Sequence, residues 1–234
     1  MSLTLTAILT ALGGLIAGLA CGAVALHWQY ERLLAARRRT AAALRRADDA
    51  EYLALHDDTT GIPNRRAFLT ALDRALTTGE PTGVVLLDLD DFKTVNDTYS
   101  HDHGNEVLTT VGLRLADLPA PVVLAARLSG DEFALLIAGH REQTRAGAFA
   151  AAKAVSGPPI PIAGTGEIGM RASVGYAQAG DDGDTARALL HHADLAMYEA
   201  KRAKAAVTDA TPAHLPPHTR CRDAHHSNNP ATSD

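Results

Sequence analysis

Residues 127–138 read R-L-S-G-D-E-F-A-L-L-I-A, which places two adjacent carboxylates at a Ser-Gly turn beside a continuous apolar run. Apolar runs joined by small, turn-forming residues are typical of a β-hairpin. We therefore expect strands at Val122–Leu128 and Phe133–Ala138. On this stretch alone, Asp131 and Glu132 could be solvated residues of the hairpin, so their role depends on what the rest of the chain brings to them.

A second acidic stretch lies at the end of another apolar run. Val84–Leu89 predicts a buried strand, and Asp88 lies near its end. A carboxylate there is unfavourable unless it is solvated, paired or bound to a metal. If this strand lies beside the hairpin, Asp88, Asp131 and Glu132 converge and repel one another. Oxygen ligands of this kind suit Mg²⁺ bound together with phosphate oxygens, so the three acids predict a site for metal-dependent phosphoryl transfer.

The two small residues of the turn fit the same interpretation. Ser129 and Gly130 leave room for a nucleotide to approach the backbone while the carboxylates face the metals. Two metals held in this way can activate an attacking hydroxyl and stabilise the leaving oxygen.

The remaining periodic segments alternate between helix and strand. The predicted helices are Asn105–Leu118, Glu142–Ser156 and Ala186–Lys204, and a further strand is predicted at Arg171–Ala177. This order favours the α/β class, as an α+β sandwich in which a mainly antiparallel central sheet is flanked by helices.

The composition narrows the class of protein. The chain has 234 residues, a formal net charge of −5 and 46% hydrophobic residues, which argues against a disordered acidic chain and against a nucleic-acid-binding protein. Its two cysteines, Cys21 and Cys221, lie far apart in unlike contexts, so neither a disulfide framework nor a zinc site is indicated. A reducing, cytoplasmic setting for the main domain fits.

The N-terminal region predicts a single membrane-spanning helix over residues 1–28. Leu3–Leu26 carries no charge, and as a helix it would extend about 36 Å, enough to cross a hydrocarbon core of about 30 Å. Trp28 and Tyr30 follow where an interfacial belt would lie. Six arginines come next: Arg32, Arg37, Arg38, Arg39, Arg45 and Arg46. The positive-inside rule then places the rest of the chain in the cytoplasm, anchored to the inner (cytoplasmic) membrane.

Two other interpretations of this segment, a cleaved signal peptide and a lipoprotein site, fit the sequence less well than a membrane span. A cleaved signal peptide would have a basic start and a shorter apolar run. The stretch L-A-C-G around Cys21 resembles a lipoprotein site, but Gly18 stands where a large aliphatic residue is expected. Gly14, Gly18 and Gly22 recur every four residues, which indicates either a helix-dimerisation face or the ordinary glycine content of membrane helices; both interpretations stay open.

A connector and a tail flank the central domain. Residues 29–55 are rich in Ala, Leu, Arg and Glu and contain no Pro or Gly, so they predict a continuous helix whose weak heptad pattern leaves a coiled coil as one option. Residues 207–234 turn to Thr, Pro, His and Asn and predict a disordered tail. The histidines and the cysteine of the tail lack standard metal-ligand spacing, so we expect them to be solvated.

Four blocks of the central region match one family in order and spacing. They are H-D-D-T-T-G-I-P-N-R-R (56–66), D-L-D-D-F-K-T-V-N-D (88–97) with S-H-D-H-G-N (100–105), R-L-S-G-D-E-F (127–133) and H-A-D-L-A-M-Y-E-A-K (192–201). Together they resemble the GGDEF domain of the diguanylate cyclase family, with an SGDEF variant of its signature. The resemblance implies a domain over residues 56–206 with a fold of the nucleotide-cyclase and polymerase-palm type. It also implies a membrane-anchored cyclase that condenses two GTP into cyclic di-GMP and releases pyrophosphate.

The resemblance also implies a role for each matched residue of the metal site. Asp88 and Asp131 would ligate two Mg²⁺ ions, with Mn²⁺ as a substitute; Glu132 would assist and the Leu89 carbonyl would be available. Asp131 would also take the proton from the attacking 3′-hydroxyl. These roles make Asp131 and Glu132 the expected catalytic residues.

The substrate contacts implied by the family lie in three of the blocks. Asn96 would hydrogen-bond guanine, at a base-reading site that includes position 105. The backbone around Asp91, Phe92 and Lys93 would hold the β- and γ-phosphates. Lys201 would contact the triphosphate as a point charge. Ser129 and Gly130 would lie against the nucleotide. Each protomer would hold one GTP, so the active form would be a homodimer.

The sequence departs from the family pattern at four places. Ser129 replaces the first glycine of the signature, and Asn105 stands where the family has an aspartate that reads guanine. Ala205 lies where a phosphate-binding arginine is expected, and residues 120–123 read A-P-V-V in place of the R-x-x-D product-inhibition site. Two alternatives to the cyclase therefore stay open: a degenerate, non-catalytic GTP-binding or dimerisation module, and a cyclase with relaxed purine specificity.

Overall fold

The computed structural model of the protein describes residues 2–162, 164 and 166–209. The chain divides into two compact units, residues 1–52 and residues 53–234. Most of helix α1 (Ser2–Leu55) forms the first unit, and the second unit contains the β-sheet.

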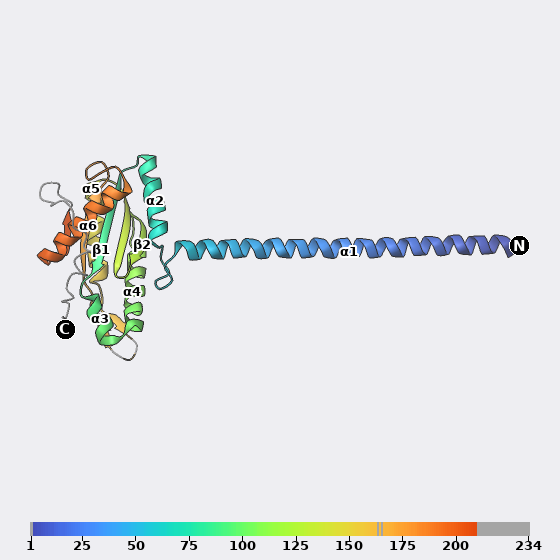
Figure 1. The fold of residues 1–234 in the computed structure, drawn as a ribbon, viewed down its shortest axis with the longest axis horizontal. Helices are drawn as coiled ribbons and strands as arrows, with labels where there is room; N and C mark the ends of the chain where they lie inside the picture. The colour runs from blue at the N-terminus through green and yellow to red at the C-terminus, as the bar shows by residue number, and fades with distance from the viewer. Residues whose placement is uncertain (1, 163, 165, 210–234) are drawn as a thin grey trace, which may run out of the picture. The chain divides into compact units, whose positions relative to one another are not determined.

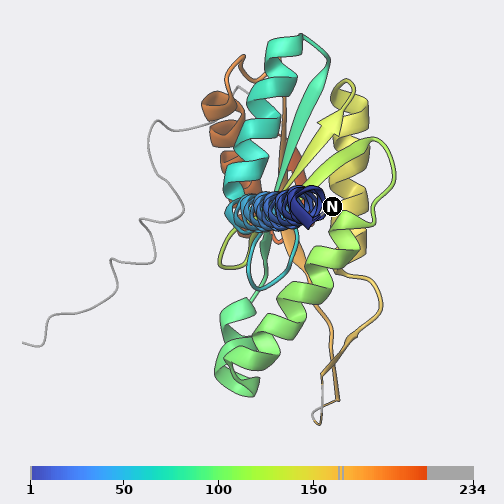
Figure 2. The ribbon, with the colours of Figure 1, turned by 90° about the vertical axis from the view of Figure 1, so that its right-hand side faces the viewer.

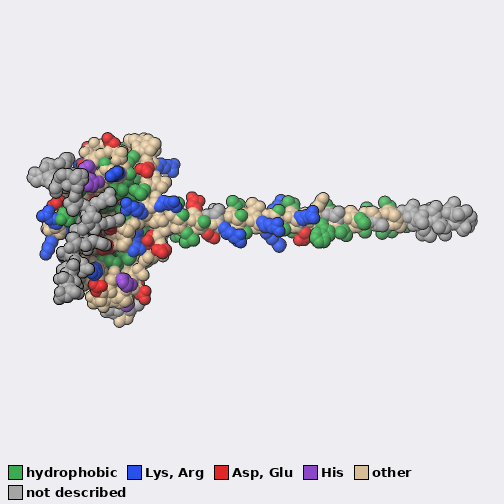
Figure 3. Space-filling model, in the orientation of Figure 1, with side chains coloured by type: hydrophobic (Ala, Val, Ile, Leu, Met, Phe, Trp, Pro, Cys, Tyr) green, Lys and Arg blue, Asp and Glu red, His purple; other side chains and the backbone are tan. Residues whose placement is uncertain are grey.

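Helix α1 runs without a break through the predicted span and the predicted connector, which confirms the continuous helix over residues 29–55. Within Leu12–Leu55, an 18-residue stretch has a mean hydropathy of 1.4, so the helix is long and apolar enough to cross a membrane by length and composition. Its arginines are exposed, and Figure 3 shows Lys and Arg side chains in blue along it. A Cβ atom at Gly14, Gly18 or Gly22 would have no heavy atom within 4 Å, so a helix pair on this face stays a prediction.

A five-stranded sheet in the order β2-β3-β1-β6-β7 forms the centre of the second unit (Figure 1). Its strands are β1 (Thr82–Leu89), β2 (Val122–Ser129), β3 (Glu132–Ala138), β6 (Ala172–Gln178) and β7 (Val207–Asp209). Neighbouring strands are antiparallel except β6 and β7, which are parallel. A separate hairpin consists of β4 (Ile160–Ile162) and β5 (Gly166–Ile168). A mixed, mostly antiparallel sheet flanked by helices confirms the predicted fold class.

Helices cover both faces of the sheet, because alternate residues of each strand point to opposite sides. They are α2 (Arg65–Thr78), α3 (Phe92–Tyr99), α4 (His101–Ala116), α5 (Arg141–Val155) and α6 (Ala186–Ala203). Figure 2 shows α2 and α6 on one side of the sheet and α4 and α5 on the other. The core under α2 and α6 contains Phe68, Leu72, Val84, Leu86, Leu189 and Met197. The core under α4 and α5 contains Val85, Leu87, Val111, Leu115, Leu135 and Val155.

Every strand and helix predicted between residues 84 and 204 is present, with ends that differ by a few residues. The largest difference is α4, which begins at His101 rather than at Asn105, because the chain turns sharply at Ser100. Helices α2 and α3 and strands β4, β5 and β7 were not predicted. Strand β7 corrects the predicted start of the tail: Val207–Asp209 pairs with Val174–Tyr176 and belongs to the sheet, while residues 210–234 lie outside the described residues.

Ser100 adopts a backbone conformation that L-residues rarely take, with φ 107° and ψ 162° between α3 and α4. This region is almost exclusive to glycine, and a non-glycine residue there costs about 1–3 kcal/mol. Ser100→Gly removes that strain but increases the entropy of the unfolded chain. We therefore expect Ser100→Gly to raise the free energy of unfolding by about 1 kcal/mol, measured by urea denaturation. Ser156→Gly, where φ is −80°, is the matched control, and we expect it to be neutral or destabilising. A Ser100→Gly variant less stable than wild type would contradict the strain argument.

Candidate active site

The sheet register brings the two acidic stretches together. Asp88, the seventh residue of β1, pairs directly with Glu132, the first residue of β3. The Leu89 amide donates a hydrogen bond to the Asp131 carbonyl at 3.3 Å, which fixes the turn beside the end of β1. Because Val84 and Leu86 face α2 and α6, the alternation along β1 turns Asp88 toward the same face. The predicted meeting of Asp88 with the hairpin acids is therefore present in the fold.

Lys201, in the last turn of α6, reaches this acidic edge. Its Nζ donates to Asp88 Oδ1 at 2.6 Å. The Lys201 side chain is 41% exposed and the Asp88 side chain only 18%, so the contact lies at the margin of the buried sheet. The structure thus brings Lys201 to the predicted metal ligand, across 113 positions of sequence.

The carboxylates of this edge are held in an unfavourable electrostatic environment. Burial raises the pKa of Asp88. The hydrogen bond from Lys201 lowers this pKa, whereas the negative charges of Asp131 and Glu132 add to the rise. Burial also raises the pKa of Asp131; Glu132 adds to the rise, while Lys201 opposes it. A divalent cation would relieve these repulsions, which is the electrostatic property expected of a metal site.

Hydrogen bonds within and beside the hairpin fix its shape. Gly130 has φ 53°, a left-handed conformation that glycine adopts without a steric cost. The Ser129 hydroxyl donates to Glu132 Oε2 at 2.9 Å, so this serine orients a carboxylate of the site. Arg127 Nε donates to the Gly130 carbonyl at 2.9 Å and holds the turn from the side.

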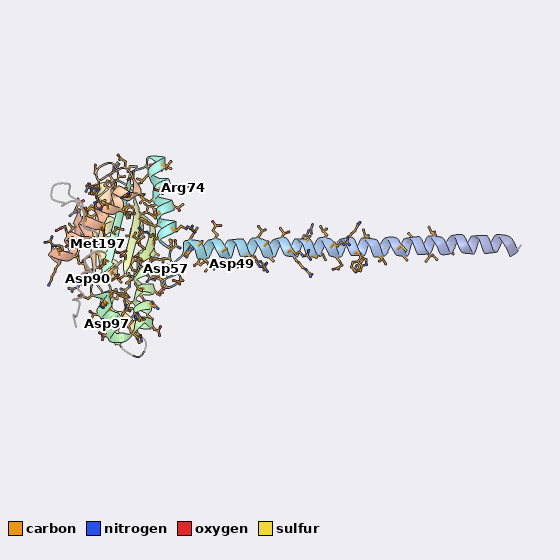
Figure 4. The ribbon with its side chains drawn as sticks, viewed as in Figure 1. Asp49, Asp57, Arg74, Asp90, Asp97 and Met197 are labelled. Carbon is orange, nitrogen blue, oxygen red and sulfur yellow. The ribbon has the colours of Figure 1, made fainter. Side chains whose placement is uncertain are left out.

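Arg127 also links the hairpin to the segment before α2, which the sequence did not predict. Its guanidinium forms a 2.8 Å ion pair with Asp57, a residue labelled in Figure 4. Burial works against ionisation of Asp57, but hydrogen bonds from Arg127 and Thr60 outweigh it and lower the pKa of Asp57. The sequence signal for Asp57 was the match of H-D-D-T-T to the first family block, and this match did not identify Arg127 as its partner.

The predicted base-reading residues lie together at the junction of α3 and α4. A Cβ atom on Gly104 would come within 2.0 Å of Asn96 Oδ1, so the Asn96 side chain rests against the start of α4. Asn105 is the next residue and is exposed. Phe92 is 7% exposed and packs into the core under α4 and α5, so only its backbone is available to a ligand, whereas Lys93 is exposed.

Asp90 is a further carboxylate of this edge that the sequence analysis did not single out. Its Oδ1 accepts a hydrogen bond from the Ser173 hydroxyl at 2.7 Å, and its amide donates to the Arg171 carbonyl at 2.9 Å. Both contacts tie the β1–α3 turn to β6. Asp90 therefore has a partner in the sheet and positions the turn that leads to Phe92.

The convergence of the acids is looser than the sequence analysis predicted. Among the residues that the structure describes, no group of three Asp, Glu, His or Cys side chains is gathered as a ready metal centre. Asp88, Asp131 and Glu132 are neighbours without forming such a cage. This still fits Mg²⁺, which usually binds through one or two carboxylates and completes its shell with waters and substrate phosphates. The donor set is also oxygen only, as a hard cation requires.

A cavity lies beside β2 of the hairpin and the start of α2. It has a volume of about 560 Å³ and is lined mainly by the start of α2 and by Arg127 and Leu128 of β2. Asp88, Asp131 and Lys201 do not line it. The acidic edge is therefore not part of this cavity.

Curated relatives share this part of the chain. TpbB, a diguanylate cyclase of Pseudomonas aeruginosa, is 37% identical over 156 residues, which cover 64% of this chain and 36% of TpbB. The response regulator PleD of Caulobacter vibrioides is 37% identical over 163 residues, covering 66% and 35%. The cyclic di-GMP phosphodiesterase PdeR of Escherichia coli is also 37% identical, over 161 residues that cover 67% and 24%. The chain spans about a third or less of the length of these relatives.

Solved structures show the same fold. The GGDEF domain of TpbB aligns with a TM-score of 0.59 and 34% identity, over 65% of this chain and 98% of that one. The coiled coil and GGDEF domain of DgcB from Caulobacter crescentus, solved with c-di-GMP, aligns with a TM-score of 0.68 and 26% identity, over 76% and 97%. The family profile described as "Diguanylate cyclase, GGDEF domain" matches residues 54–206, well over half of the chain. The chain belongs to the GGDEF family of diguanylate cyclase domains.

Proposed function

We propose that this chain is a membrane-anchored diguanylate cyclase that condenses two GTP into cyclic di-GMP and releases two pyrophosphates. The observation that carries the proposal is the pairing of Asp88 with Glu132 beside the Asp131 turn, with Lys201 of α6 on the same edge. This edge combines oxygen ligands for metal ions with a cation for phosphate, as phosphoryl transfer requires.

Each residue of the edge takes a defined role. Asp88 and Asp131 would hold two Mg²⁺ ions, with Glu132 and the Leu89 carbonyl as additional oxygen ligands. Bound there, the ions would activate the 3′-hydroxyl and stabilise the leaving pyrophosphate oxygen. Asp131 accepts the hydroxyl proton. Ser129 keeps Glu132 oriented through its 2.9 Å hydrogen bond.

Three sets of residues hold the nucleotide. Lys201 contributes a mobile positive charge for the triphosphate, because its side chain is long and partly exposed. The backbone of the β1–α3 turn, at Phe92 and Lys93, binds the outer phosphates. Asn96, held against Gly104, contacts the guanine together with Asn105.

The active form is a homodimer in the cytoplasmic membrane. The reaction joins two nucleotides, and one acidic edge accounts for one of them, so two copies must place their edges face to face. The partial exposure of Lys201, at 41%, supports this, because the edge is accessible to a facing copy through that side chain. The apolar first half of α1 supports membrane anchoring by its length and composition. Its glycines at 14, 18 and 22 provide a face for a second helix.

The test of the proposed function is direct. The purified full-length protein, held in lipid nanodiscs, is incubated with GTP and Mg²⁺, and the nucleotide products are separated and identified by mass spectrometry. Cyclic di-GMP that appears only with Mg²⁺ supports the cyclase. Bound but unchanged GTP identifies the non-catalytic module.

The non-catalytic alternative rests on two positions. Asn105 and Ala205 stand where the family has residues that bind guanine and phosphate, and PdeR shows that a related domain also occurs in a protein named for another activity. The acids that the reaction itself requires, Asp88, Asp131 and Glu132, are all present and favour the enzyme.

Asn105 predicts weak discrimination between purines. A carboxylate accepts from both guanine N1–H and its 2-amino group, whereas an amide offers one acceptor and presents a donor to guanine's donors. We expect Asn105→Asp to tighten GTP binding about 10- to 100-fold and to weaken any ATP binding, measured by titrating both nucleotides against both variants. Asp102→Asn, an exposed change in the same helical turn, is the control. An unchanged ratio of GTP to ATP affinity would mean that residue 105 does not read the base.

A further inference from the structure

The ammonium of Lys201 occupies one carboxylate oxygen of Asp88, the proposed metal ligand. Its Nζ is 2.6 Å from Asp88 Oδ1, a close charge-assisted hydrogen bond. A divalent cation that uses this oxygen must compete with the ammonium for the same lone pairs. The contact is therefore more than a structural ion pair at the edge of the sheet.

Lys201 also acts on the rest of the acidic edge. Burial raises the pKa values of both Asp88 and Asp131, and the positive charge of Lys201 works against the rise at each of them. The charge of Arg127, a residue of β2, also works against the rise at Asp131, but the hydrogen bonds of its guanidinium go to Asp57 and to the Gly130 carbonyl. Lys201 thus supplies the positive charge that Asp88 contacts directly.

We propose that Lys201 is the internal counter-ion of the metal site and makes the binding of metal and nucleotide mutually dependent. Without nucleotide, the ammonium holds Asp88 and opposes the metal. When a triphosphate arrives, the ammonium moves to a phosphate oxygen and leaves Asp88 free for the metal. This inference rests on the proposed function, because it takes Asp88 as a metal ligand.

The fold makes Lys201 the partner that can move. Asp88 belongs to the central strand and is paired on both sides, with Glu132 and with Ser173. Lys201 lies in the last turn of α6, and its long side chain is 41% exposed. A flexible stem with a point charge can exchange one oxygen for another without a change in the backbone.

A counter-ion role for Lys201 has a consequence that a substrate-binding role alone would not have. Lys201→Met should weaken nucleotide binding and, at the same time, strengthen metal binding in the absence of nucleotide. Linkage requires that the metal then improves nucleotide affinity less in the variant than in wild type. A lysine that only bound phosphate, or only stabilised the fold, would leave the affinity for metal alone unchanged or lower.

The experiment measures Mn²⁺ binding to the full-length protein in zwitterionic nanodiscs without nucleotide, by the loss of the free Mn²⁺ signal in electron paramagnetic resonance. We expect Lys201→Met to bind Mn²⁺ about five- to tenfold more tightly than wild type, at the lower end of typical coupling between sites. Lys201→Arg keeps the charge and should stay close to wild type. Arg187→Met removes a charge at the other end of α6 and is the matched control, with no change expected.

The outcomes separate this proposal from the one on which it rests. Unchanged or weaker Mn²⁺ binding in Lys201→Met, with binding still lost in Asp88→Asn, overturns the counter-ion role alone. If Asp88→Asn binds Mn²⁺ as wild type does, Asp88 is not a ligand, and the metal assignment falls together with the inference. A similar gain in Arg187→Met would reduce the effect to net charge and also overturn it.

Discussion

Asp131→Asn is expected to abolish cyclic di-GMP synthesis while the protein stays folded. The substitution preserves the size of the side chain but removes the charge that the metal requires and the group that accepts the hydroxyl proton. Loss of one such group lowers a rate by about 10²- to 10⁴-fold, and loss of a metal ligand adds to this. Stability should not fall, because burial and the charge of Glu132 already disfavour an ionised Asp131.

The measurement is the initial rate of product formation from GTP, with the urea unfolding midpoint of the same preparations as the check on folding. Asp117→Asn is the matched control, since Asp117 is an exposed carboxylate that follows α4. Its rate should equal that of wild type. A folded Asp131→Asn protein that makes product at the wild-type rate would contradict the assignment of the acidic edge as the active site.

Gly175→Ala should be the most damaging single-methyl substitution for the fold. Gly175 lies in β6 on the face covered by α6, and the helix backbone touches it. A Cβ atom there would lie 2.1 Å from Met197 N and 2.2 Å from Ala193 O. Backbone atoms cannot rotate away, so α6 must move off the sheet. We expect a loss of about 3 kcal/mol of unfolding free energy, or roughly 6–12 °C in Tm.

The same displacement reaches the acidic edge, because α6 carries Lys201. Gly175→Ala should therefore weaken nucleotide binding as well as stability, although Gly175 is not itself a residue of the acidic edge. Gly169→Ala is the control: a Cβ atom at Gly169 would meet nothing within 4 Å, so stability should stay within about 0.5 kcal/mol of wild type. Equal unfolding curves for the two variants would show that α6 does not pack on β6 as described.

Strong local patterns made most of the elements predictable. The apolar runs that became β1, β2, β3 and β6 are bounded by turn residues, and burial on both faces of a sheet favours such runs. Helices α2 and α3 were not predicted: α2 begins within the last two residues of the block 56–66, and α3 has only 8 residues. Strand β7 was missed because its three residues gain their stability from pairing with β6, which no local pattern reveals.

The sequence by itself determined the composition of the acidic edge. Asp88, Asp131, Glu132 and Lys201 were all named from their positions in motifs, because chemistry restricts which residue types can serve there. The motifs also identified the departures at Asn105 and Ala205. The motifs could not predict which of these residues touch in the folded protein, because a motif gives the order of residues along the chain and not their positions in space.

Only the tertiary structure decided which of these residues touch. The register of β1 against β3 set Asp88 opposite Glu132, and the packing of α6 on β6 brought Lys201 to Asp88. The pairing of Arg127 with Asp57 joins positions 70 apart. Such contacts depend on strand register and helix packing, which are fixed by the whole core at once. A change of one residue in that register would turn Asp88 to the other face of the sheet, with every local motif unchanged.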